Sequence, residues 1–196
     1  MYKNKVKRIL DILLALVLIP FISFISLIIV ILIRFEDGGP VFYKGKRLGE
    51  KGKVFKMYKF RSMKVNAPDL RNEDGSTFNS ENDLRLTKIG KVLRKTSLDE
   101  LPQIINVLIG EMSFVGPRPD LPEHITYYTN SEIKKLRVKP GITGYNQAFY
   151  RNSIEWKERL KNDVYYSENL SLFFDLKILM FTVINVFNKK GIYKDV

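Results

Sequence analysis

The stretch ILLALVLIPFISFISLIIVILI, residues 12–33, decides the architecture that this sequence predicts. It carries no charged side chain, and about 20 apolar residues in a helix are enough to cross the hydrocarbon core of a bilayer. A cleaved signal peptide is disfavoured, because the apolar run is long for such a segment and the following RFEDGGP contains no small-residue cleavage site. The stretch therefore predicts a helix that stays in the membrane.

Two features bear on whether this helix crosses the bilayer. Pro20 removes a backbone donor and clashes with the carbonyl of Leu16, so a kink is expected there. Ser23 and Ser26 can satisfy backbone groups that the kink frees. Both flanks are basic, which draws both ends toward the cytoplasmic side; the flanking residues are Lys3, Lys5, Lys7, Arg8, Arg34, Lys44, Lys46, Arg47, Lys51 and Lys53. From these residues alone, a re-entrant hairpin with its break at Pro20 and Ser23 and a kinked true span are equally supported.

Composition narrows the chemistry and the partners. The length of 196 residues predicts one domain. The chain has no cysteine, which excludes a disulfide framework, a zinc–thiolate site and a thiol nucleophile, and its single histidine, His124, argues against a multi-histidine metal site. A formal charge of +12 favours anionic partners, namely nucleic acid, acidic lipid or a phosphorylated substrate.

The rest of the chain predicts an α+β fold with a small β-hairpin. In residues 34–64, PVFYK and KVFKMYKFR alternate as strands do, and LGEKGK between them is typical of a turn. The segment 170–190 is apolar but interrupted by Asp175 and Lys177, which fits an interfacial amphipathic helix or a packed core helix. The remaining expectations are a polar loop at 65–83, helices at 87–95, 99–109, 123–138 and 153–169, an extended turn at FVGPRPD, and a turn-rich loop at 139–152.

An acidic pair, Asp99-Glu100, stands out in this basic chain. Ser97 and Glu100 match a capping box. A helix with Asp99 as its N-cap accommodates Pro102 better, because Pro102 then lies at position N3, where the helix needs no backbone N–H donor. Asp99 would then lie at the positive end of a helix dipole, where its ionised form is favoured, as a cap, a magnesium ligand or a nucleophile.

Two arginines near this pair fit phosphate chemistry. Arg94 precedes it and Arg118 follows it in GPRP, and guanidinium forks match phosphate geometry. Carboxylates, arginines and a basic hairpin beside a membrane indicate phosphoryl chemistry on a lipid-linked phosphate. Solvated surface arginines or contacts with lipid headgroups are the alternative.

Several long motifs in order give the chain a resemblance to a known family. It closely resembles the monotopic phosphoglycosyl transferases, or bacterial sugar transferases, over nearly its whole length. The motifs are DGGPVFYKGKRLG, YKFRSM, RLTKIGKVLRKTSLDELPQIINVLIGEMSFVGPRP, KPGITGYNQ and DVYYSENLSLFFDLKIL.

The resemblance implies an enzyme on the cytoplasmic face of the bacterial inner membrane. Such an enzyme moves a sugar-1-phosphate from a UDP-sugar to polyprenyl (undecaprenyl) phosphate and releases UMP, the first membrane step of surface glycan biosynthesis. It implies Mg²⁺ as cofactor, a covalent phosphosugar–aspartate intermediate, contact with membrane lipid and a supply of product to downstream glycosyltransferases. It also implies a re-entrant membrane segment at 1–36 and a catalytic region at 37–196.

The same resemblance assigns roles to individual residues. Asp99 is implied as nucleophile and magnesium ligand, and Glu100 as a support for metal binding or proton handling. The residues implied to bind substrate are Lys59, Arg61, Arg94, Pro117, Arg118 and Pro119. One departure concerns the membrane break, which in the family falls at a Ser-Pro pair; here that place is Ser23-Phe24, and the proline lies about one turn earlier.

Two other classes of protein fit this sequence less well. A membrane-anchored nucleic-acid-binding protein fits the basic charge, but the sequence has no helix-turn-helix or RNA-binding signature, so no nucleic acid partner is expected. A non-catalytic scaffold in a glycan assembly complex is disfavoured by the intact acidic pair and arginines. The sequence does not identify the sugar.

Overall fold

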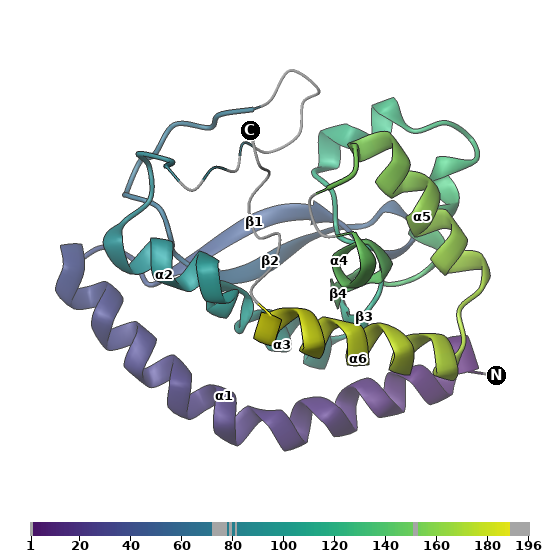
Figure 1. Cartoon of the computed structure of the whole chain (residues 1–196), viewed down its shortest axis with the longest axis horizontal. Coiled ribbons are helices and arrows are strands. Elements are labelled where there is room, and N and C mark those ends of the chain that lie inside the picture. Colours follow the sequence, from purple (N-terminus) through teal and green to yellow (C-terminus); the bar gives the residue numbers. More distant parts are fainter. Residues whose placement is uncertain (1, 72–77, 79, 81, 151–152, 189–196) are drawn as a thin grey trace.

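The computed structural model describes residues 2–71, 78, 80, 82–150 and 153–188 of the chain. It is a mixed fold of helices and small sheets, consistent with the predicted α+β class. In Figure 1, the long helix α1 lies along one side of the molecule, and the strands and remaining helices lie on its other side. The helices are α1 Lys7–Asp37, α2 Lys88–Thr96, α3 Gln103–Ile109, α4 Tyr145–Phe149, α5 Trp156–Glu168 and α6 Leu172–Asn188.

Short elements connect these helices. A π-helical turn, η1 Tyr2–Val6, precedes α1, and four 3₁₀ segments follow along the chain: η2 Glu50–Gly52, η3 Leu98–Glu100, η4 Pro122–Tyr127 and η5 Glu132–Arg137. The strands are β1 Phe42–Leu48, β2 Val54–Phe60, β3 Ser113–Val115 and β4 Gly141–Thr143. The strands β1 and β2 form the predicted antiparallel hairpin, and β3 and β4 pair in parallel.

The helix α1 is continuous where the sequence predicts a break. Both Pro20 and Ser23 are exposed within the helix, which runs unbroken to Asp37 and is bent near its middle in Figure 1. A proline removes only one hydrogen bond of the ladder, so it bends a helix that neighbouring packing supports at both ends. The prediction of two helices separated by a break was therefore wrong in this respect, and the bend takes its place.

Most of the apolar surface of α1 is uncovered. Among the described residues, it is the one helix long and apolar enough to cross a membrane, and only 11% of its most apolar window is buried. Its exposed side chains include Val17, Phe21 and Phe24. A core helix of a soluble protein would be mostly covered, so this exposure indicates association with a membrane.

The amino-terminal end of α1 is attached to the protein by polar contacts. Lys7 pairs with the buried Asp175 of α6 at 2.5 Å. Arg8 donates to the last carbonyls of α3. Asp11 accepts from the hydroxyl of Ser113 at 2.9 Å and from the next backbone N–H at 3.1 Å.

The carboxyl-terminal end of α1 is attached to the same body. Glu36 accepts hydrogen bonds from the backbone N–H of Lys88 at 2.6 Å and of Ile89 at 3.2 Å, which are the first residues of α2. Asp37 pairs with Arg61. Both ends of α1 are therefore held by one folded unit, and its apolar middle faces outward.

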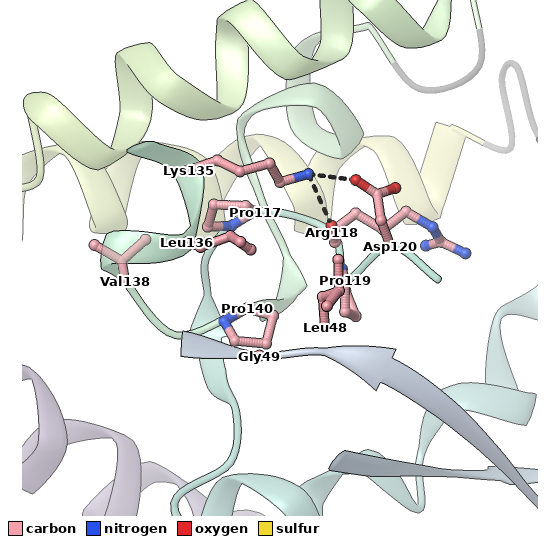
Figure 2. Close-up of a pocket in the computed structure, with 10 residues that line it drawn as sticks. All are labelled: Leu48, Gly49, Pro117, Arg118, Pro119, Asp120, Lys135, Leu136, Val138 and Pro140. Atoms are coloured by element: carbon pink, nitrogen blue, oxygen red, sulfur yellow. Dashed lines mark hydrogen bonds and ion pairs between the residues drawn. The ribbon is translucent and has the colours of Figure 1, made fainter. Parts of the chain in front are cut away.

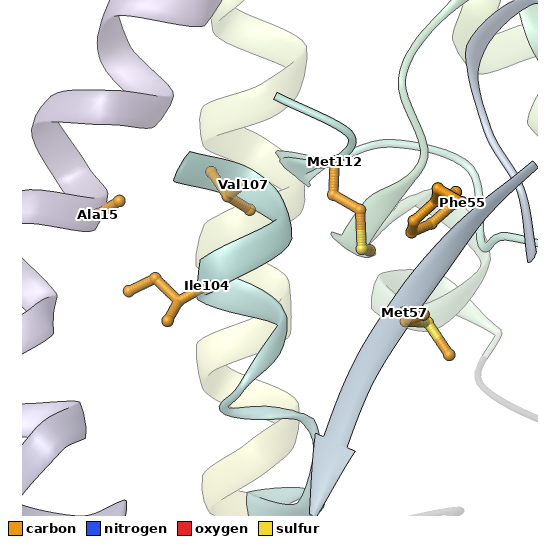
Figure 3. Close-up of a cluster of buried hydrophobic side chains, with 6 residues drawn as sticks. All are labelled: Ala15, Phe55, Met57, Ile104, Val107 and Met112. Carbon is orange, nitrogen blue, oxygen red and sulfur yellow. The ribbon is translucent and has the colours of Figure 1, made fainter. Parts of the chain in front are cut away.

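A compact apolar cluster joins α1, β2 and α3. Figure 3 shows its side chains converging between these elements. Ala15 is fully buried, because its small side chain lets α1 approach α3 closely. The members are Ala15, Phe55, Met57, Ile104, Val107 and Met112. This packing fixes the position of α3, which begins just after the acidic pair.

The helix predicted at 123–138 is wrong. Two 3₁₀ segments, η4 and η5, stand there instead. A local capping box marks the start of η5. Thr129 N–H donates to the Glu132 carboxylate at 2.7 Å, and the Thr129 hydroxyl accepts from Glu132 N–H at 3.3 Å. The loop predicted at 139–152 was wrong in part, since it contains β4 and α4.

Other predicted elements are confirmed with shifted ends. The expected helices at 87–95 and 153–169 are α2 and α5, and the turn at FVGPRPD begins with β3. In the polar loop at 65–83, the described residues form no helix or strand beyond a bridge; residues 72–77, 79 and 81 lie outside the described part. The carboxyl-terminal helix α6 packs through Ile178 and leaves Phe173 and Met180 exposed.

A glycine sets the distance between α2 and the chain that leaves β2. A Cβ at Gly90 would lie 1.9 Å from the carbonyl oxygen of Ser62. We expect Gly90→Ala to lower the free energy of unfolding by about 1–3 kcal/mol, because α2 must move away from this backbone. Thermal unfolding of the purified protein measures the loss. Lys91→Ala, an exposed neighbour on the same helix, is the control; equal stability of both variants would contradict the close contact.

Candidate active site

The acidic pair lies in a 3₁₀ turn between two helices. Ser97, which ends α2, has the left-handed φ of 58°, and the chain turns there into η3. The helix α3 begins at Gln103 with Pro102 as its N-cap. The prediction that Asp99 caps a helix from 99 to 109 was therefore wrong, because Pro102 ends the 3₁₀ turn and starts α3 itself.

A lysine from the hairpin reaches the pair. Lys59 Nζ lies 2.6 Å from Glu100 Oε1 and 4.0 Å from Asp99 Oδ2. Arg118 Nη2 lies 3.6 Å from the same Glu100 oxygen. The structure thus brings together four of the residues that the sequence singled out, from three separate segments of the chain.

The two carboxyls differ in pKa. Burial raises the pKa of Asp99, the nearby Lys59 opposes that rise, and the charge of Glu100 adds to it. Burial would also raise the pKa of Glu100, but Lys59 and Arg118 outweigh burial and lower it to about 2. The expectation that a helix dipole favours ionised Asp99 is thus overturned, because burial is the larger effect.

The pair therefore has divided roles. Glu100 stays anionic and holds Lys59, while the buried Gln103 also donates to it. Within the described part of the chain, no group donates a hydrogen bond to the Asp99 carboxylate. A buried carboxylate that is short of hydrogen bonds is a stronger nucleophile than a solvated one.

Arg94 and Arg61 occupy different surroundings. Arg94, on α2, donates to the hydroxyl of Ser62 at 3.0 Å and lies close enough to Asp99 to oppose the rise of its pKa. Arg61 instead binds Asp37 and the carbonyls of Pro40 and Met63. The geometry therefore gives Arg61 a structural role at the end of α1, because β2 ends just before it and the chain turns away from the pair.

Arg118 projects from the segment Pro117-Arg118-Pro119, which rests on buried charges. Figure 2 shows both prolines lining a small cavity, with Lys135 directed to Asp120 and to the Arg118 carbonyl. The cavity holds about 10 Å³, which is no more than one water molecule. It is thus part of the support for Arg118, too small to be a substrate site.

Sequence reasoning missed this support. Lys135, 3% exposed, lies 2.7 Å from both Asp120 and Asp163. Tyr128 donates to Asp120 at 2.6 Å. These residues lie in separate elements of the chain, so no local pattern indicates their contact. Nothing in the sequence distinguishes Lys135 from the many other lysines as one that is buried between two carboxylates.

The pair offers a donor set that suits Mg²⁺. Among the described residues there is no group of three or more possible metal ligands. Magnesium, however, is commonly held by one or two carboxylates together with substrate phosphates. The oxygens of Asp99 and Glu100 fit that arrangement, with phosphate oxygens of a substrate completing the shell.

The long exposed apolar helix indicates association with a membrane, and comparisons with known proteins specify the family. The model of the bacterial sugar transferase family matches residues 2–189. EpsL of Bacillus subtilis, an uncharacterized sugar transferase, is 44% identical over 186 residues, which are 95% of this chain and 89% of that protein. The exopolysaccharide production protein ExoY of Rhizobium meliloti is 41% identical over 95% of this chain and 88% of its own length.

A longer relative is also similar. The UDP-glucose:undecaprenyl-phosphate glucose-1-phosphate transferase of Escherichia coli is 40% identical over 95% of this chain, which corresponds to 41% of that protein. The chain therefore belongs to the bacterial sugar transferase family.

We expect Asp99→Asn to raise the melting temperature at pH 7, because burial disfavours the charged carboxylate. This cost exists above the raised pKa of the folded state and is absent below 3.8, the ordinary value, where the group is protonated whether folded or not. The gain should therefore vanish as the pH falls below 3.8. Thermal unfolding at several pH values measures it, and a lower melting temperature of Asp99→Asn at pH 7 would contradict the raised pKa.

Glu100→Gln is the matched comparison and should act in the opposite direction. In the wild type, the ion pairs of Glu100 stabilise the fold above pH 4.5, the ordinary pKa of a glutamate. This stabilisation is lost as the pH falls through about 2, the pKa of Glu100 in the folded protein. At pH 7 we expect a loss of about 1–3 kcal/mol, because Lys59 keeps a buried charge without its partner.

Proposed function

We propose that this protein transfers a sugar-1-phosphate from a UDP-sugar to undecaprenyl phosphate and releases UMP, as the first membrane step of surface glycan assembly. The observation that carries the proposal is a buried Asp99 that accepts no hydrogen bond from the described residues and lies among Lys59, Arg94 and Arg118. The named activity of the Escherichia coli relative supports the choice of donor and acceptor.

In the first half-reaction, a carboxylate oxygen of Asp99 attacks the phosphorus that carries the sugar. The bond from this phosphorus to the bridging oxygen breaks, and UMP leaves with that oxygen and the bond's electron pair. A covalent phosphosugar–aspartate remains. Arg94 and Arg118 stabilise the charge that develops on the phosphate oxygens, since guanidinium groups bind phosphate through paired donors.

In the second half-reaction, an oxygen of undecaprenyl phosphate attacks the same phosphorus. The bond to Asp99 breaks, the carboxylate is restored, and the lipid diphosphate sugar is released to glycosyltransferases that extend it. Two half-reactions at one carboxylate predict ping-pong kinetics. Asp99 and Glu100 are the residues that would hold Mg²⁺, which when bound neutralises diphosphate charge and favours departure of UMP.

We propose further that α1 is re-entrant and that the active site faces the cytoplasm. The contacts of Lys7 and Arg8 at one end of α1 and of Glu36 and Asp37 at the other all lie on one folded body. A helix with both ends so attached leaves that body on one side of the bilayer. The basic flanks favour the cytoplasmic side, and the exposed apolar face of α6 fits the interface of the same leaflet.

The proposed reaction is tested with purified protein, Mg²⁺, undecaprenyl phosphate and a panel of UDP-sugars, following UMP. We expect UMP release with at least one sugar, and without the lipid acceptor a single burst that leaves labelled phosphosugar on the protein. Asp99→Asn should abolish both while still binding membranes. Glu158→Gln, an equal change at an exposed carboxylate, is the control. Appreciable turnover by Asp99→Asn would refute the nucleophile, and no release with any sugar would refute the donor class.

The proposed topology is tested by cysteine labelling, since the chain has no native cysteine. Lys5→Cys and Lys44→Cys lie at exposed positions on either side of the apolar run. We expect an impermeant maleimide to label both in inverted membrane vesicles and neither in right-side-out vesicles. Phe24→Cys, inside the run, should stay unlabelled in both. Labelling of the two lysine positions from opposite sides would establish a true span.

A further inference from the structure

One face of β1 carries a guanidinium group in an unusual setting. Tyr43, Gly45 and Arg47 alternate along the strand and so share this face. Gly45 is buried, and a Cβ there would lie 3.3 Å from Arg47 Nη1 and 2.9 Å from the ring of Tyr43. The missing side chain thus leaves the space in which the Arg47 guanidinium lies back along the strand.

Arg47 is half-buried, yet it has no acidic partner in the part of the chain that the structure describes. Among the described residues, no carboxylate lies within ion-pair distance of it, and its hydrogen bond goes to the carbonyl of its neighbour Lys46 at 2.8 Å. Asp120, whose negative charge acts on Arg47, already accepts hydrogen bonds from Lys135 at 2.7 Å and Tyr128 at 2.6 Å. Half-buried cations in folded proteins usually have a carboxylate partner.

The positive charges of two other arginines act on Arg47. Burial lowers its pKa, and the like charges of Arg118 and Arg71 lower it further. Arg71 itself pairs with Asp69 at 2.5 Å. Cations that repel one another destabilise the ligand-free protein. An anion bound between them would attract each cation and so stabilise the folded state.

The backbone fixes Arg47 beside the active site. Leu48 N–H donates to the Asp120 carbonyl at 2.8 Å, which ties the end of β1 to the segment that carries Arg118. Arg118 in turn lies 3.6 Å from Glu100. An anion held between Arg47 and Arg118 would therefore lie next to the acidic pair.

The geometry points to a phosphate subsite formed by Arg47 and Arg118 over Gly45, which binds the phosphate of the leaving nucleotide. This assignment rests on the proposed function for the identity of the ligand. Arg118 and Lys59 both lie against Glu100, so Arg47 adds a guanidinium with no carboxylate partner among the described residues, which can follow the departing phosphate as its charge grows. A Cβ at Gly45 would crowd both the Tyr43 ring and the Arg47 guanidinium, so the glycine keeps room for Arg47 on this face.

The test compares Arg47→Gln with Lys46→Gln in the full-length protein in detergent. Lys46 is exposed, adjacent on β1 and on its opposite face, so both variants lose one positive charge from the same strand. Binding of inorganic pyrophosphate and of UDP is measured by calorimetry. We expect Arg47→Gln to weaken both by about tenfold or more, as for loss of a charged hydrogen-bond donor, and Lys46→Gln to change them less than twofold.

Two further readouts separate binding from structure. Arg47→Gln should keep or raise the melting temperature of the ligand-free protein, because it removes repulsion, and should lose most of the stabilisation that pyrophosphate gives to the wild type. Arg47→Lys keeps the positive charge but loses the paired donors of the guanidinium. Its affinity for pyrophosphate should therefore lie between those of the wild type and Arg47→Gln. Equal pyrophosphate affinity in wild type and Arg47→Gln, or no affinity in wild type, would overturn the subsite.

The phosphate of a lipid headgroup has the same chemistry, so a second arm uses vesicles containing phosphatidylglycerol. We expect Arg47→Gln to bind them as the wild type does; loss of vesicle binding with retained pyrophosphate binding would overturn the nucleotide assignment. Failure of the proposed function is distinguishable. If the protein turns over no UDP-sugar but Arg47→Gln still binds pyrophosphate more weakly than the wild type, the anion subsite is supported and the proposed transfer reaction is refuted.

Discussion

Polar contacts attach both ends of α1 to one folded body, and these contacts position the helices around the acidic pair. Glu36 binds the free N–H groups at the start of α2, and Arg8 binds carbonyls in the last turn of α3. An acid at a helix N-terminus and a base at a C-terminus both complement the helix dipole. The membrane helix therefore holds, at their outer ends, the two helices that flank the acidic pair.

This arrangement connects the membrane to the chemistry. The turn that joins α2 to α3 carries Asp99 and Glu100, so its position follows from how α1 lies. The hairpin adds Lys59, which neutralises Glu100 and leaves Asp99 as the carboxylate with the raised pKa. Adjacent acids thus take different roles because one cation lies 2.6 Å from one of them and 4.0 Å from the other.

Two elements that depend on interactions between neighbouring residues were predicted correctly from the sequence. The hairpin and α2 have the predicted limits within a few residues, because alternation and the Thr87 cap are encoded next to each other in the chain. The expected helix at 123–138 failed because a capping box at Thr129 outweighs the helical spacing, and this signal was in the sequence. The break expected at Pro20 became a bend, because contacts at both ends of α1 support the helix.

The membrane segment, the hairpin, the acidic pair and the likeness to sugar transferases could all be predicted from the sequence, because each depends on neighbouring residues or on the order of motifs. The environment of each charge, in contrast, is set by the tertiary fold. The fold turned Arg61 toward Asp37, buried Lys135 between Asp120 and Asp163, and brought Arg118 to the acidic pair. Burial and the distance between charges set pKa values and binding, and both arise from segments far apart in the chain.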